Sequence, residues 1–153
     1  MSRSSDVIRI LGGKTLATAE SLTGGGIGAA LTAVPGSSAV YKGGVISYTN
    51  EIKRALLGVS AETLDRYGAV SQQTAGEMVS GVRKLLNADI AVSATGLAGP
   101  GGDEFGNPVG TVYIGYEDQH RAIVMHYCFE GDRDSVRVQT IEAALALILE
   151  NNA

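Results

Sequence analysis

Apolar and polar residues recur along the chain with two different periods, which predict an alternation of helices and strands. Between 75 and 86, and again between 138 and 148, apolar residues return every three or four positions, as on one face of an α-helix. Shorter helices are expected at 5–11, from the turn after Ser21 to about Val34, at 50–57 and at 61–66. Apolar or alternating runs predict strands at 15–20, 45–49, 89–95, 110–116 and 121–129.

The order of these elements predicts the fold class. Strands that alternate with helices in the first part of the chain favour parallel pairing, whereas 110–116 and 121–129, joined by the polar turn 117–120, favour an antiparallel hairpin. We therefore expect an α/β fold, a three-layer α/β/α sandwich whose mixed sheet has about five strands. No repeat, charge block or Ser/Pro-rich linker interrupts the 153 residues, so one domain spanning 1–153 is expected.

Composition and charge disfavour several classes of protein. A chain that is 44% hydrophobic and 18% charged can bury a core, which argues against disorder. Twelve basic against sixteen acidic residues, with no cluster of Lys and Arg, disfavour binding to nucleic acid. There is no apolar run long enough for a signal peptide or a membrane span, so we expect a cytoplasmic protein. The single cysteine and the two histidines lack the spacing of a metal site, and we expect no metal.

A first candidate for chemistry lies in the glycine-rich segment 20–26. If a strand ends at Glu20, Ser21 lies on the turn into a helix, with the free N–H groups of the first helical turn behind it. That placement suits a nucleophile beside an oxyanion hole, although a serine there can equally be only a helix cap. Gly24, Gly26 and Ala29 also match a relaxed dinucleotide-binding fingerprint, but Glu51 lies at a helix start instead of a strand end.

A second candidate is Lys53. With Asn50 as the expected N-cap, Lys53 lies in the first turn of its helix, where the positive end of the helix dipole disfavours an ammonium. Partial burial would lower its pKa further and make it a base. The alternative is a solvated surface lysine.

A third candidate is the long loop from Thr95 to Gly110, which contains six glycines and two of the three prolines. Loops of this length are usually functional or mobile, and a ligand loop is favoured here. Arg133 and Arg137 follow at i and i+4 near the start of the last helix, where charge and dipole together attract phosphate. Alternatively, both pair with the neighbouring acidic residues.

The motifs in their order and spacing resemble the CinA C-terminal domain family, whose stand-alone members act as nicotinamide mononucleotide amidohydrolases. The resemblance runs from about Thr15 to Leu149 through TAESLTGG, PGSS, YKGGVISYTNEIK, LLGV, YGAVS, the loop 95–102, PVGTV and GDRDSVR. It implies a deamidase of pyridine nucleotide salvage that uses a serine and lysine pair, Ser21 and Lys53. A nearby tyrosine, Tyr48, is expected to take part in catalysis by relaying a proton or orienting Lys53. It further implies a nucleotide substrate, no cofactor and a homodimer.

The same resemblance implies a set of binding residues. Thr95, Gly96, Gly99 and Arg133 are expected to hold the nucleotide, and helix geometry adds Arg137. Thr23, Gly24, Gly25 and Asn50 flank the pair and are expected to contact substrate, with N–H groups near Thr23 and Gly24 stabilising the oxyanion. Leu22 stands where the family usually has cysteine, so altered packing is expected there. Two alternatives stay open: a non-catalytic nucleotide- or protein-binding module linked to competence or DNA damage, and hydrolysis of another small amide.

Overall fold

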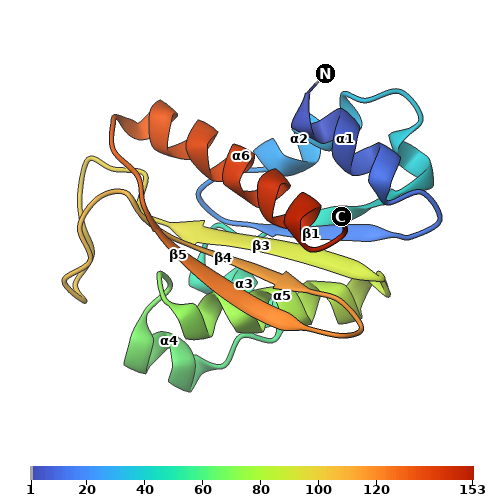
Figure 1. The fold of residues 1–153 in the computed structure, drawn as a ribbon. Coiled ribbons are helices and arrows are strands. Elements are labelled where there is room, and N and C mark those ends of the chain that lie inside the picture. Colours follow the sequence, from blue (N-terminus) through green and yellow to red (C-terminus); the bar gives the residue numbers. More distant parts are fainter. Residues whose placement is uncertain (1) are drawn as a thin grey trace.

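A five-stranded sheet lies between two layers of helices in the computed structural model, which describes residues 2–153 (Figure 1). The strand order is β2-β1-β3-β4-β5, with β1 parallel to β2 and β3, and β3-β4 and β4-β5 antiparallel. The expected three-layer α/β fold with a mixed sheet is thus confirmed. The strands are β1 (Leu16–Glu20), β2 (Tyr41–Ile46), β3 (Ile90–Gly96), β4 (Thr111–Glu117) and β5 (Ala122–Cys128).

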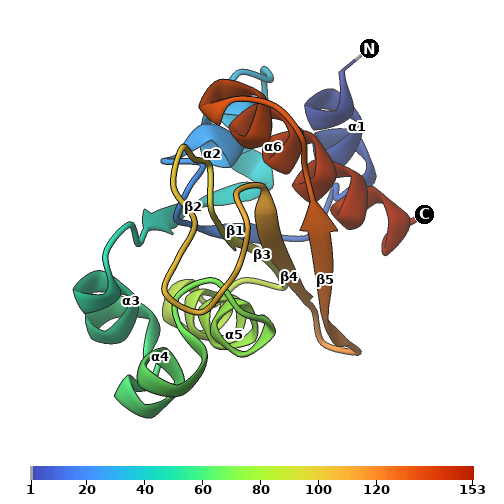
Figure 2. The same cartoon turned by 90° about the vertical axis from the view of Figure 1, so that its left-hand side faces the viewer.

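Helices cover both faces of the sheet (Figure 2). On one face lie α1 (Arg3–Ile10), α2 (Gly26–Thr32) and α6 (Arg133–Glu150). On the other lie α3 (Asn50–Leu57), α4 (Ala61–Tyr67) and α5 (Gln72–Leu86). Because β1 leads into the first layer and β2 into the second, a crevice opens beyond the carboxyl ends of the parallel strands. The loop between β3 and β4 lies at this crevice, toward the viewer in Figure 2.

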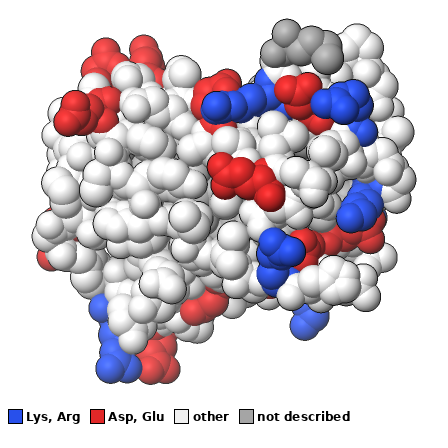
Figure 3. Space-filling model, in the orientation of Figure 1, with Lys and Arg blue, Asp and Glu red and all other residues white. Residues whose placement is uncertain are grey.

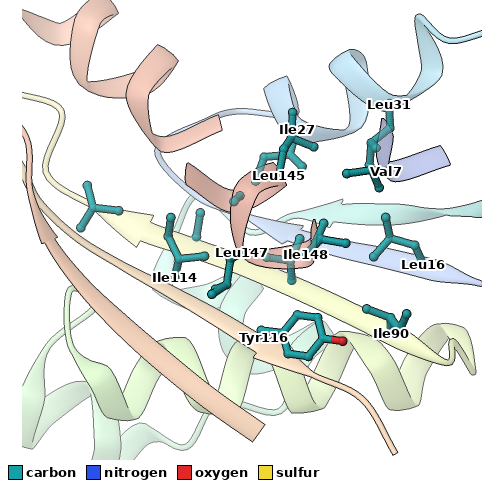
Figure 4. Close-up of a cluster of buried hydrophobic side chains, with 14 of the residues drawn as sticks. Val7, Leu16, Ile27, Leu31, Ile90, Ile114, Tyr116, Leu145, Leu147 and Ile148 are labelled. Atoms are coloured by element: carbon teal, nitrogen blue, oxygen red, sulfur yellow. The ribbon is translucent and has the colours of Figure 1, made fainter. Parts of the chain in front are cut away.

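Two apolar cores hold the layers together. Above the sheet, Leu145 and Ile148 of α6 pack toward β3 and β4, with the Tyr116 ring beneath them, and Ile27 of α2 lies beside Leu145 (Figure 4). Below it, the apolar stripe of α5 packs on β1 and β3. Full burial of one such aliphatic side chain contributes about 1.5–3 kcal/mol, so the periodic apolar positions determine which helix faces the sheet.

Two predicted boundaries were wrong near the site. The strand expected at 45–49 runs instead from Tyr41 to Ile46, because Gly44 lets β2 approach β1 so closely that a Cβ would collide with Thr18. The N-cap of α3 is Thr49, whose hydroxyl accepts the N–H of Ile52 at 3.4 Å, so Asn50 is the first helical residue. As expected, a turn follows Ser21, and the helix after this turn, α2, begins at Gly26.

Candidate active site

The tip of the Lys53 side chain and the Ser21 hydroxyl meet beyond the carboxyl end of β1. Lys53 Nζ lies 3.1 Å from Ser21 Oγ, and both residues are buried, Lys53 to 1% exposure and Ser21 to 7%. The two residues are 32 positions apart in sequence; Ser21 follows β1, and Lys53 belongs to α3. The structure therefore brings together the predicted serine and lysine within proton-transfer distance.

Backbone contacts on both sides fix the position of Ser21. Its N–H donates to the carbonyl of Ala94 at 3.0 Å, which extends the pairing of β1 with β3 by one residue. Its carbonyl accepts the N–H of Gly24 at 3.1 Å, closing a tight turn in which Gly24 has φ +60° and Gly25 φ +97°. Glycine is favoured at both positions because other residues rarely adopt positive φ.

Lys53 reaches the site from the first turns of α3 and is held there by backbone oxygens. Its Nζ donates to the carbonyl of Ser47 at 2.9 Å and lies 3.4 Å from that of Tyr48. Within residues 2–153, no carboxylate forms an ion pair with this amine. Burial therefore lowers the pKa of Lys53 from 10.5 to about 8, since desolvation disfavours the ammonium. The alternative of a solvated surface lysine is excluded.

A pocket of about 340 Å³ opens directly over the pair. Eight of the residues expected at the site line it, and three more lining residues belong to the loop that was predicted to bind a ligand. The predicted ones are Ser21, Tyr48, Asn50, Lys53, Thr95, Gly96, Gly99 and Arg133. The others are mostly small or apolar, namely Leu22, Ala69, Val70, Leu97, Ala98 and Gly101. Ala69 and Val70 belong to the YGAVS segment, and their small apolar side chains carry no chemical group that would have marked them as part of a site.

Arg133 bridges the mouth of this pocket. One guanidinium nitrogen donates to the carbonyl of Gly99 at 2.6 Å and another to the hydroxyl of Tyr48 at 3.1 Å. The Tyr48 hydroxyl therefore contacts Arg133 in this structure, while only the backbone of Tyr48 lies against Lys53. Arg133 does not form an ion pair with its acidic neighbours in the described part of the chain, which leaves its charge directed at the loop and the pocket.

Four expected binding residues lie outside the pocket lining. Thr23 is fully buried and its hydroxyl donates to Glu20 at 2.7 Å, while Gly24 and Gly25 form the turn behind Ser21. Arg137 lies behind that turn and donates to the carbonyls of Leu22 and Thr23. These residues shape the backbone next to the pocket instead of lining it.

Most of the backbone N–H groups that were expected to stabilise an oxyanion already donate to other acceptors. Those of Ile27 and Gly28, at the start of α2, donate to the carboxylate of Glu20 at 2.8 and 3.0 Å. That of Gly24 donates to Ser21. Among residues 2–153, the N–H groups of Leu22 and Thr23 have no hydrogen-bond acceptor, so this segment retains two free donors next to Ser21.

On the face shown in Figure 3, basic side chains lie among acidic ones and form no continuous patch. Across residues 2–153, no three His, Cys, Asp or Glu side chains come together as metal ligands. Nor does any helix of the described chain have the length and apolar character needed to cross a membrane.

Comparison with known proteins points to one family. A sequence model of the CinA C-terminal domain matches residues 4–151. CinA-like proteins of Thermotoga neapolitana and Endomicrobium trichonymphae are 47% and 48% identical over 91% and 88% of this chain. The chain spans about a third of the length of these relatives, 34% and 32%.

Solved structures agree with this match. A CinA superfamily protein from Klebsiella pneumoniae has a TM-score of 0.95 at 39% identity, covering 97% of this chain and 94% of its own. A competence/damage inducible protein from Agrobacterium tumefaciens has a TM-score of 0.92 at 37% identity, covering 100% and 98%. The same fold is therefore present in both.

Proposed function

This chain belongs to the CinA C-terminal domain family, and we propose that it hydrolyses the carboxamide of nicotinamide mononucleotide to nicotinate mononucleotide and ammonia. The observation that carries this proposal is the buried contact of 3.1 Å between Lys53 Nζ and Ser21 Oγ. A serine hydroxyl is a weak nucleophile unless a base takes its proton, and an adjacent uncharged amine can do so.

The lowered pKa of Lys53 supports its role as that base. With a pKa of about 8, roughly one-tenth of the amines are neutral at pH 7, whereas at a pKa of 10.5 the neutral fraction would be several hundred times smaller. General bases work best when their pKa lies near the working pH. No charged partner is required, since burial is the cause of the shift.

The proposed reaction proceeds in two steps. Neutral Lys53 takes the proton of Ser21, whose oxygen attacks the carboxamide carbon, and the tetrahedral intermediate collapses as the C–N bond breaks. The proton on Lys53 passes to the leaving nitrogen, which departs as ammonia. Water then attacks the ester and gives its proton to Lys53, and Ser21 recovers a proton as the acid leaves. One amide and one water thus give one acid and one ammonia.

Two backbone donors are available for the oxyanion. The N–H groups of Leu22 and Thr23 are free of other acceptors in the described chain, whereas that of Gly24 is occupied by Ser21. Removing one donor from an oxyanion hole typically costs about 10²–10³ in rate, so a fixed pair of donors is a substantial contribution. We assign this role first to Leu22, which lines the pocket, in place of the first turn of α2; the fully buried Thr23 is the second donor of the same turn.

The pocket fits a nucleotide of this kind. Its volume of about 340 Å³ lies within the usual range of roughly 300–1,000 Å³ for ligand sites. The apolar side chains of Leu22, Val70 and Leu97 offer surface to an aromatic ring, and Arg133 at the mouth offers charge to a phosphate. In this proposal the phosphate competes with the carbonyl of Gly99 for the Arg133 guanidinium.

The test is ammonia release from nicotinamide mononucleotide by the purified protein, without added metal. Ser21→Ala and Lys53→Ala should each lower turnover by about 10³-fold or more while the protein stays folded. Lys42→Ala is the matched control, because Lys42 is an exposed lysine on β2 whose amine donates to the carbonyl of Asn87. A folded native chain that releases no ammonia would refute the proposal, and retained nucleotide binding would then favour a binding module.

A further inference from the structure

We propose that Arg137 and Glu20 are positioning residues that hold the turn of residues 21–25 so that Ser21 faces Lys53. The inference rests on the proposed function, because it assigns the turn a catalytic purpose. Neither residue lines the pocket, and neither contacts Lys53. Both act on the turn itself, Glu20 from the end of β1 and Arg137 from α6.

Arg137 donates hydrogen bonds to two consecutive carbonyls of the turn. Its Nε donates to Leu22 at 2.9 Å and its Nη2 to Thr23 at 3.2 Å, although these residues are more than a hundred positions away in the chain. Arg137 forms no ion pair within residues 2–153, so its half-buried guanidinium is directed at the turn alone. The planar guanidinium of arginine, whose donors are fixed, binds two neighbouring oxygens better than the ammonium of a flexible lysine does.

Glu20 holds the opposite side of the same turn. Its carboxylate is 2% exposed and accepts the Thr23 hydroxyl at 2.7 Å and the N–H groups of Ile27 and Gly28 at 2.8 and 3.0 Å. No lysine or arginine pairs with it in the described chain. A buried charge that is satisfied by local N–H and O–H donors ties the end of β1 to the start of α2, and the turn lies between them.

The two contacts converge on Thr23. Its side chain is held by Glu20 and its carbonyl by Arg137, so the residue cannot rotate without breaking one of them. In a trans peptide, C=O and N–H point in opposite directions. Binding of the Leu22 carbonyl by Arg137 therefore also directs the N–H of Thr23 away from Arg137, and that N–H is one of the two free donors beside Ser21.

The contacts that Arg137 and Glu20 make with residues 21–25 are called the clamp below. The composition of the turn explains why the clamp is required. Gly24, Gly25 and Gly26 follow one another, and glycine has the largest backbone freedom of all residues. The first two adopt positive φ, and the Arg137 side chain lies 3.4 Å from where a Cβ on Gly24 would be. A displacement of about 1 Å at a reacting group can cost about 10²-fold in rate, so a flexible turn would lose activity without fixed contacts.

The experiment measures kcat and KM for ammonia release together with the rate at which a small sulfonyl fluoride modifies Ser21, read by mass spectrometry. Arg137→Gln should lower kcat and the rate of modification by a similar factor, about 10- to 100-fold, with KM within about threefold of native. Arg137→Lys should recover part of both rates. Arg3→Gln is the matched control, since Arg3 is an exposed arginine that contacts α6 through Glu142, away from the pocket.

A second pair of variants tests the contact between Glu20 and Thr23 by changing Thr23, so that the buried carboxylate of Glu20 stays in place. Thr23→Val keeps the shape of the side chain but loses the hydroxyl that Glu20 binds, whereas Thr23→Ser keeps it. Thr23→Val should lower both kcat and the rate of Ser21 modification, while Thr23→Ser stays near native. Thermal unfolding checks that each variant is folded. Because the sulfonyl fluoride contains no nucleotide, modification of Ser21 without ammonia release would contradict the proposed substrate and leave the clamp supported.

Three results would overturn the inference. The first is Arg137→Gln with native kcat and native modification rate. The second is a loss confined to KM, which would make Arg137 a substrate-binding residue. The third is a native chain in which Ser21 does not react at all, which would also remove the catalytic role of the turn.

Discussion

The unfolding free energy of Lys53→Met, compared with that of the native protein, should increase as the pH falls from about 10.5 to about 8. Lys53 is 1% exposed, and burial lowers its pKa from 10.5 to about 8. That difference corresponds to about 3 kcal/mol of unfolding free energy. Methionine has a similar shape and no proton to exchange, so it removes the cost of the buried amine.

The sign follows from the number of protons bound in each state. Above pH 10.5 the amine is neutral in both the folded and the unfolded chain, and it imposes no cost. Between pH 10.5 and about 8, the unfolded chain takes up a proton that folded Lys53 does not, so the unfolding free energy of the native protein falls. Below about pH 8 both states are protonated, and the loss stays constant.

Lost hydrogen bonds give the comparison a constant offset. Methionine leaves the carbonyl of Ser47 without its donor, which costs about 1–3 kcal/mol at every pH. The informative quantity is therefore the change with pH, an increase of about 3 kcal/mol in the stability of Lys53→Met relative to native between pH 10.5 and 8.

Urea unfolding across this range measures the effect, with Lys42→Met as the control. Lys42 is exposed and should show no such dependence. A stability difference for Lys53→Met that stays flat from pH 8 to 10.5 would refute the lowered pKa, and with it the argument that Lys53 acts as an uncharged base.

Three further outcomes are expected. The kcat/KM for ammonia release should rise about tenfold per pH unit below about pH 8 and then level off as Lys53 loses its proton; a flat profile would contradict its role. Tyr48→Phe should raise KM with kcat nearly native, because the Tyr48 hydroxyl contacts Arg133. A large fall in kcat would instead support the expected proton relay through Tyr48. In unfolding experiments Gly81→Ala should cost about 1–3 kcal/mol, since its Cβ would collide with a backbone carbonyl of α3, whereas Gly76→Ala on the same helix should not destabilise.

The prediction succeeded where the signal is local in sequence. The period of apolar residues in 75–86 identified α5, and alternating or apolar runs identified β1, β3, β4 and β5 to within about one residue. It failed at β2, because the bounds of that strand depend on how closely Gly44 approaches Thr18 of β1. Such a contact depends on the neighbouring strand and leaves no period in the sequence.

Some features of the candidate site could also be predicted from the sequence, and others could not. Serine and lysine at the starts of helical segments, the glycine-rich loop and Arg133 could be selected from residue type and position. The partners of Arg137 could not, because its side chain binds carbonyls more than a hundred residues away and its own neighbours suggested phosphate or acidic groups. Glu20 was taken only as the end of a strand, yet it is the buried acceptor that organises the start of α2.

The sequence by itself determined the α/β class, the mixed sheet and the residue types available for chemistry, since periodicity and turn composition act over a few neighbouring residues. Only the tertiary structure decided that Lys53 is buried against Ser21, because desolvation and a distance of 3.1 Å arise when β1, β2 and α3 pack together. The same packing lowers the pKa of the amine and clamps the serine turn, so the properties that matter for reactivity belong to the assembled fold.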